Sequence, residues 1–124
     1  MPQMPAGSAI INTTSVEAYE PAPILLDYAA AKSAINTFTK SLARQVAPKG
    51  IRVNAVAPGP VWTPPLEVVG GQPASALKQF GAQTPLGRPA QPAEMAPAFV
   101  FLASQEASYV IGETLSATGG MPTP

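Results

Sequence analysis

The feature that most constrains the fold is a long helical pattern at residues 27–47. Its large apolar side chains recur at spacings of three and four, which gathers them in one stripe along a helix: Ile35, Phe38, Leu42 and Val46. Asp27 caps this helix or favours its first turn, and Pro48 with Gly50 closes it. A helix of this length with an apolar stripe has to pack against another layer of the protein.

Three short runs with β-branched residues predict strands at 8–13, 51–57 and 114–118. A second helix is expected after Pro92, which suits a first helical position, and Pro97 should bend it or confine the bend to its beginning. Strands that alternate with helices indicate a parallel sheet, so the pattern predicts an α/β fold.

A long segment rich in Pro, Gly and Gln fills residues 60–91, with a possible short helix at 74–80. Loops of this length are often lids or binding loops, and we interpret this one as a substrate-binding lid. Trp62 and Phe80 are candidates to line a substrate pocket there, although such aromatic side chains equally often only pin a loop.

Composition excludes several kinds of chemistry. The chain has no Cys and no His, so thiol nucleophiles, zinc–thiolate sites and a Ser-His-Asp arrangement are excluded, and no metal site is expected. Seven basic residues balance seven acidic ones without a basic stripe, which argues against a nucleic-acid partner. No secretory signal or membrane-spanning run is apparent, so a cytoplasmic protein without a membrane partner is expected.

Three polar residues form the candidate catalytic group: Ser15, Tyr28 and Lys32. Tyr28 and Lys32 are four residues apart in the expected helix and therefore share a face. An ammonium group near a phenol stabilises the phenolate, which helps a tyrosine to exchange a proton with a carbonyl or alcohol oxygen. Ser15 follows the first strand, where open α/β sheets bind ligands. Taken alone, a Tyr–Lys pair at this spacing is more often ordinary helix surface.

The longer motifs resemble the short-chain dehydrogenase/reductase family. These are "INTTS", "YAAAK", "IRVNAVAPGPVWT", "GRPAQPAEMAPAFVFLAS" and "SYVIGETLSATGG", which together cover almost the whole chain. The stretches "PGPVWTP", "GGQP" and "QFGAQTPLGRPAQP" look like general-stress and glucose-dehydrogenase-like members. The resemblance implies the C-terminal part of a Rossmann-type doubly wound parallel sheet, with about three strands and two to three helices.

The resemblance also implies an NAD(P)-dependent oxidoreductase that interconverts an alcohol and a carbonyl. Tyr28 would be the general acid/base, Lys32 would stabilise its phenolate and hold the nicotinamide ribose, and Ser15 would polarise the substrate carbonyl. The nicotinamide end would be lined by residues after the second strand: Pro58, Gly59, Val61 and Thr63. Trp62 would face a small alcohol, aldehyde or ketone, while Asn54 is expected to brace the strand ends. Asn12 stays ambiguous.

The chain departs from the family pattern in what it lacks. Members are much longer, and their first half carries a Gly-rich turn, a residue that selects NAD or NADP, an "NNAG" stretch and a catalytic asparagine. None of these is present, and "VGGQP" at residues 69–73 sits in the expected lid. Residues 1–124 therefore resemble the C-terminal half of a dinucleotide-dependent dehydrogenase domain. The alternative is a non-catalytic remnant or assembly fragment that cannot hold the dinucleotide by itself.

A homo-oligomer, either a dimer or a tetramer, is the expected assembly. Charged residues make up only 11% of the chain at zero net charge, and such surfaces tend to associate. The Ala-rich face of the long helix would favour close packing against a partner helix, as the corresponding helix does in the family.

Overall fold

The computed structural model describes residues 3–63 and 78–123. At its centre is β2 (Arg52–Pro58), with β1 (Ala9–Thr13) on one side and β3 (Thr114–Ala117) on the other. Both pairings are parallel, with Thr13 opposite Val56 and Pro58 opposite Ala117. The predicted α/β class and parallel sheet are confirmed, and each strand lies within one residue of its expected bounds.

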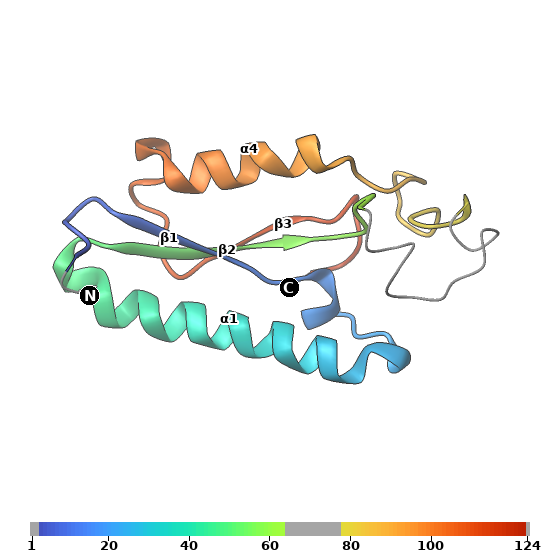
Figure 1. The fold of residues 1–124 in the computed structure, drawn as a ribbon, viewed down its shortest axis with the longest axis horizontal. Helices are drawn as coiled ribbons and strands as arrows, with labels where there is room; N and C mark the ends of the chain where they lie inside the picture. Colours follow the sequence, from blue (N-terminus) through green and yellow to red (C-terminus); the bar gives the residue numbers. More distant parts are fainter. Residues whose placement is uncertain (1–2, 64–77, 124) are drawn as a thin grey trace.

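Two helices sandwich the sheet, with α1 (Leu26–Val46) on one face and α4 (Pro92–Ala103) on the other (Figure 1). Under α1 the core is formed by a cluster of fully or nearly fully buried residues: Ala43, Val46, Ile51 and Val53. Under α4 a second cluster consists of Val56, Leu102 and Ala107. Successive side chains of a strand point to opposite faces, which is how Val53 and Val56 reach different layers.

The buried face of α1 agrees with the expected stripe only in part, at Val46 and at Leu42, which packs against the core cluster. Its buried residues are small or β-branched: Ala29, Thr39, Ala43 and Val46. Phe38 is 57% exposed instead. Small side chains let the helix approach the sheet closely, so the larger residues are left at the margin or on the outside.

The ends of α1 follow the expected chemistry in part. Asp27 lies in the first turn, where its carboxylate accepts a hydrogen bond from the Tyr28 amide, but Leu25 holds the cap position. At the other end a short 3₁₀ turn (Ala47–Lys49) contains Pro48, and Gly50 follows with a positive φ of 69°. Gly at this position allows the left-handed conformation that ends a helix.

Helix α4 runs to Ala103 with Pro97 inside it. Its first turn is held by two bonds between Gln91 and Glu94: the Gln91 amide donates to the Glu94 carboxylate, and the Glu94 amide donates to the Gln91 carbonyl. The short helix expected at 74–80 and the Gly-rich stretch at 69–73 fall mostly or wholly outside the described residues.

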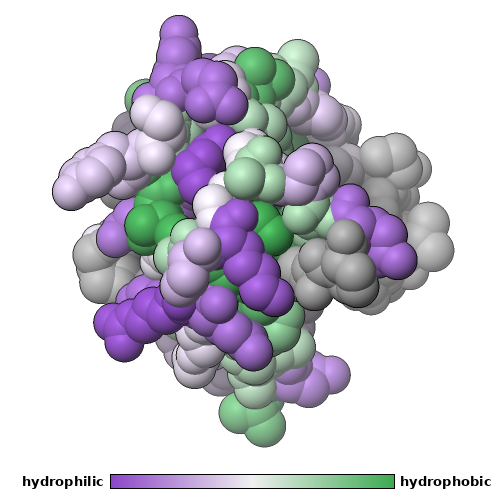
Figure 2. Space-filling model, turned by 90° about the vertical axis from the view of Figure 1, so that its left-hand side faces the viewer, coloured by the Kyte–Doolittle hydropathy of each residue, from purple (hydrophilic) through white to green (hydrophobic). Residues whose placement is uncertain are grey.

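The amino-terminal end of the sheet presents hydrophilic side chains interspersed with smaller hydrophobic areas (Figure 2).

Candidate active site

Ser15 follows β1 directly and is nearly buried, at 6% exposure. Its oxygen accepts a hydrogen bond from the Glu17 amide at 3.2 Å and so caps a 3₁₀ turn (Val16–Ala18). That bond uses the oxygen as an acceptor, which leaves the O–H group available as a donor. A hydroxyl fixed in this way can present a hydrogen bond to a ligand oxygen.

Tyr28 and Lys32 lie on the first turns of α1, which dock against the end of β1. The Lys32 ammonium lies 5.5 Å from the centroid of the Tyr28 ring, within cation–π range. The same nitrogen donates to the Thr13 carbonyl oxygen at 3.0 Å. Tyr28 is 43% exposed, so its phenol is accessible from solvent.

The register of the sheet places Ser15, which follows β1, and Pro58, which ends β2, at the carboxyl end of the sheet. Thr13 is opposite Val56, and the Thr14 amide donates to the Val56 carbonyl, so Ser15 and Pro58 each lie two residues beyond the Thr13–Val56 pair. Lys32 is tied to this end of the sheet through its bond to Thr13. Parallel sheets bind ligands at the carboxyl ends of their strands, which is the end that these residues share.

Packing within the protein explains why residue 59 is a glycine. A Cβ atom at this position would lie 2.7 Å from both the Cα and the carbonyl oxygen of Thr118. The Gly59 amide also donates to the Ala117 carbonyl. The close approach that glycine permits here is therefore to the end of β3, a constraint that the sequence alone did not reveal.

A second parallel contact pins the start of the segment 60–91 to its end. Val61 forms an isolated bridge with Ala90, in which the Trp62 amide donates to the Ala90 carbonyl and the Ala90 amide donates to the Pro60 carbonyl. This pattern uses the backbone groups on either side of Val61. Within the described part of the chain, the amide and carbonyl of Val61 itself make no hydrogen bond, so they can serve a ligand. Thr63 is half-buried just beyond.

Trp62 and Phe80 contact each other across this segment. Their ring centroids are 6.4 Å apart at an interplanar angle of 60°, an edge-to-face arrangement. Trp62 is 42% exposed. The pair therefore pins one part of the segment to another, and Trp62 still presents part of its surface outward.

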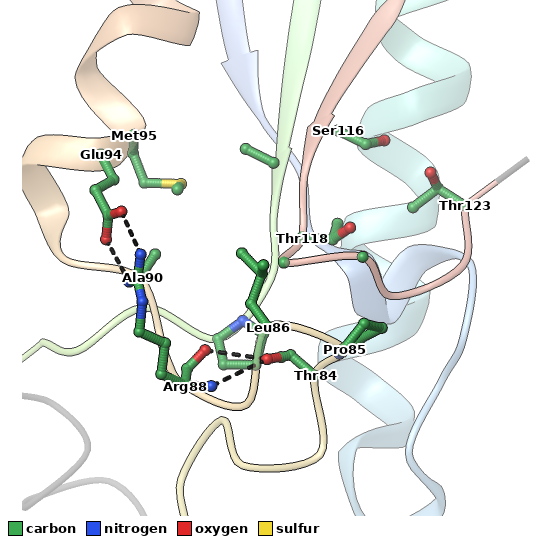
Figure 3. Close-up of a pocket in the computed structure, with 14 residues that line it drawn as sticks. Thr84, Pro85, Leu86, Arg88, Ala90, Glu94, Met95, Ser116, Thr118 and Thr123 are labelled. Atoms are coloured by element: carbon green, nitrogen blue, oxygen red, sulfur yellow. Dashed lines mark hydrogen bonds and ion pairs between the residues drawn. The ribbon is translucent and has the colours of Figure 1, made fainter.

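A pocket of about 650 Å³ adjoins the end of β3 and is lined by none of Ser15, Tyr28 and Lys32. It lies between Thr84–Arg88, the first turn of α4 and residues 116–120 (Figure 3). Sequence reasoning missed its two charged residues, Arg88 and Glu94, which form a bidentate ion pair with N–O distances of 2.7 and 2.8 Å. The sequence feature that could have indicated this ion pair is an arginine six residues before a glutamate in a Pro-rich stretch.

The ion pair shifts both groups toward their charged forms. The pKa of Glu94 is lowered to about 2, first by its hydrogen bond to Arg88 and next by the Gln91 amide. The pKa of Arg88 is raised by the same partner. Both residues are therefore charged throughout the physiological range, which suits an anchor for α4 better than proton transfer.

The two asparagines have internal partners. Asn54 is buried, donates to the Val110 carbonyl and accepts from the Glu113 amide, so it braces the chain before β3 as expected. Asn12 donates to the Thr39 hydroxyl and ties β1 to α1, which resolves its ambiguity. In the range 3–63 and 78–123, no cluster of three or more potential metal ligands occurs. Nor does any helix of that part have the length and apolarity to cross a membrane.

Comparison with known proteins identifies the family. Residues 1–122 match the model of a family described as enoyl-(acyl carrier protein) reductase. A solved short-chain dehydrogenase/reductase from Brucella melitensis, titled as a glucose/ribitol dehydrogenase, aligns with a TM-score of 0.82 and 36% identity, over 99% of this chain and 49% of that one. The chain belongs to the short-chain dehydrogenase/reductase family.

Further members of the short-chain dehydrogenase/reductase family are similar over most of this chain. The uncharacterized oxidoreductase YghA of Escherichia coli K12 is 56% identical over 97% of this chain and 40% of its own length. A 3-oxoacyl-[acyl-carrier protein] reductase of Brucella melitensis, solved with bound NAD, is 42% identical with a TM-score of 0.78, over 94% of this chain and 41% of that one. The chain thus spans about 40% of the length of the curated relatives it matches. The expected likeness to general-stress and glucose-dehydrogenase-like members is confirmed by the names of other relatives.

Proposed function

We propose that this chain is the catalytic, C-terminal half of an NAD(P)-dependent oxidoreductase that interconverts an alcohol and a carbonyl. The observation that carries the proposal is the docking of Lys32 at the end of β1. Its ammonium lies 5.5 Å from the Tyr28 ring and binds the Thr13 carbonyl, two residues before Ser15. Family membership supplies the reaction type for this group of residues.

In the proposed reduction, the Tyr28 phenol donates its proton to the substrate oxygen while hydride adds to the carbonyl carbon. In the reverse direction the phenolate takes the proton from the alcohol. Ser15 donates a hydrogen bond to the same oxygen, because its O–H group is left free by the bond to Glu17. Lys32 stabilises the phenolate by its positive charge. The substrate is a small alcohol, aldehyde or ketone.

The residues present would fit the nicotinamide end of a dinucleotide, either NAD or NADP, which when bound supplies or accepts the hydride. Lys32 would hold the ribose hydroxyls, and the backbone groups of Val61 would hold the carboxamide with the help of the Thr63 hydroxyl. Pro58 and Gly59 would shape the surface beside the nicotinamide. The exposed part of Trp62 would face the substrate, with residues 60–91 as the lid.

A second candidate is a non-catalytic assembly module. It is favoured by the free edge of β1, which pairs only with β2 among the described residues. It predicts association with a partner but no turnover.

Grafting provides the test. This chain replaces the matching segment of the E. coli relative, with which it shares 56% identity, and the graft is assayed with NAD(H) and NADP(H) against aldehydes, ketones, sugars and polyols. Tyr28→Phe should reduce turnover by roughly 10²–10⁴-fold, the usual contribution of a general acid/base. Tyr109→Phe is the matched control, because that phenol is fully exposed and outside the site. Parent-like turnover of Tyr28→Phe would refute the assignment, and dinucleotide binding without any turnover would favour the assembly module.

A further inference from the structure

Two consecutive residues at the end of β1, Thr13 and Thr14, bind the side chain and the backbone of Lys32. The Thr13 carbonyl accepts a hydrogen bond from the Lys32 ammonium at 3.0 Å. The Thr14 hydroxyl donates to the Lys32 backbone carbonyl at 2.9 Å. The side chain and the backbone of Lys32 are thus fixed to adjacent points of the same strand end.

Thr14 fixes the position of α1 relative to the sheet, because it bonds to both. It is 2% exposed, and its amide donates to the Val56 carbonyl of β2. Its hydroxyl reaches α1, so one buried residue joins β1, β2 and the turn of α1 that carries Lys32. A buried hydroxyl is costly without a partner, which favours one orientation of this side chain.

The bond to Thr14 is additional to the ordinary bonds of the helix. A carbonyl has two lone pairs, so the Lys32 carbonyl can accept from Thr14 as well as from the helix backbone. This extra bond fixes how far α1 stands from the strand end at one turn. The long stem of Lys32 could otherwise place its ammonium at many points.

We propose that Thr14 is a positioning residue for the Tyr28–Lys32 pair. The proposal rests on the proposed function for its catalytic meaning, while the hydrogen-bond geometry it invokes stands by itself. Without the hydroxyl, the turn of α1 that carries Lys32 loses its bond to the end of β1, and the distances from the Lys32 ammonium to Thr13 and to the Tyr28 ring are less closely fixed. Thr14 touches neither substrate nor cofactor in this role.

The first test measures the reactivity of the lysine in the whole protein that contains this chain. Amines are labelled with an acylating reagent, and each labelled lysine is identified by peptide mass spectrometry. In Thr14→Val, which keeps the shape and loses the hydroxyl, labelling of Lys32 should be several-fold faster than in the parent. Thr14→Ser should restore the slow rate, and Lys40, exposed on the same helix, is the internal reference.

Ser33→Ala is the matched control. Its hydroxyl donates to the Ala18 carbonyl at 3.1 Å, so this variant also removes one bond between α1 and the segment after β1, but it leaves both bonds of Lys32 intact. It should not change Lys32 labelling. If Thr14→Val does not fold, Thr14→Ala removes the hydroxyl without adding a methyl group beside the backbone oxygen. Unchanged Lys32 labelling in a folded variant without the hydroxyl, or equal acceleration in Ser33→Ala, would overturn the proposal.

The second test separates this proposal from the proposed function. If the parent protein turns over a carbonyl substrate, Thr14→Val should lower kcat by roughly tenfold to a hundredfold, with KM within about threefold of the parent, because misplacement of a catalytic group acts on the chemical step. Thr14→Ser should recover kcat. If the parent shows no turnover, the proposed function fails while the labelling result still decides the role of Thr14.

Discussion

Gly59 is a residue at which the backbone of a neighbouring strand leaves no room for a side chain. Its missing Cβ would lie 2.7 Å from Thr118, well inside normal contact distance. The constraint comes from a residue 59 positions later in the chain, so the local "PGP" sequence predicts only a turn. The strand ends of β2 and β3 are joined at this point by the Gly59–Ala117 hydrogen bond.

Gly59→Ala should therefore destabilise the protein by about 1–3 kcal/mol, the usual cost of overpacking, because the ends of β2 and β3 must move apart. Denaturant unfolding of the graft described above measures this. Gly87→Ala is the control for loss of glycine flexibility: nothing lies within 4 Å of its Cβ position, and only its φ of 70° opposes the change. A loss at Gly59 no larger than that at Gly87 would contradict the packing explanation.

At the scale of elements, the loop before α4 is fixed to the helix by Arg88, Gln91 and Glu94. Arg88 binds both carboxylate oxygens of Glu94, and the Gln91 amide binds one of them. The Val61–Ala90 bridge joins the start of the segment 60–91 to its end, and the ion pair ties that end to α4.

The Glu94 carboxylate should make a pH-dependent contribution to stability. Its pKa falls from 4.5 to about 2 on folding, so the stabilisation is fully present above about pH 4.5 and is lost as the pH falls toward 2. Glu94→Gln should flatten the pH dependence of the melting temperature in that window. Glu106→Gln, which removes the same charge outside this network, is the control. An unchanged acid profile for Glu94→Gln would show that the ion pair does not anchor α4.

Sequence reasoning located the elements well because their signals are local. The strands are β-branched runs bounded by Gly or Pro, and α1 has both its stripe and its terminating Pro48 and Gly50. The buried face of α1 was harder to predict, because close packing selects Ala29 and Ala43 over the larger Phe38. The Val61–Ala90 bridge could not be predicted, since neither residue carries a sign of a partner 29 positions away.

The candidate site was predicted in part for the same reason. The pairing of Tyr28 with Lys32 follows from helical spacing, and the place of Ser15 follows from the strand before it. The role of Thr14 depends on its distance in space from Lys32, 18 residues later on another element, which the spacing in the sequence does not encode. Arg88 and Glu94 were missed because their pairing depends on the conformation of the loop between them.

At the scale of the whole molecule, a polypeptide limited to these 124 residues should not bind NAD or NADP measurably. The groups proposed for the nicotinamide end belong to this chain, but a pyrophosphate needs a glycine turn at a helix N-terminus, which this sequence lacks. Each 1.4 kcal/mol of lost anchoring weakens binding about tenfold. Calorimetry with both dinucleotides tests this. Micromolar binding would mean that the cofactor site has been placed wrongly.

The whole protein should be a dimer or a tetramer that uses α1 and β3. Large apolar side chains are exposed on or beside these elements: Ile24 at 83%, Leu26 at 80%, Phe38 at 57% and Leu115 at 37%. Apolar surface of this kind gains free energy when it is removed from water. Light scattering at high micromolar concentration measures the mass. A monodisperse monomer there would count against association through these elements.

The parallel order of the strands has a mechanical consequence. In the described residues, the three strands of the sheet all point the same way, with β2 between β1 and β3. A force applied to the amino end of β1 and the carboxyl end of β3 therefore pulls these two strands in opposite directions along their own axes. Both ladders are loaded in shear, so many hydrogen bonds share the tension at once, whereas a hairpin pulled from its ends would open one bond at a time.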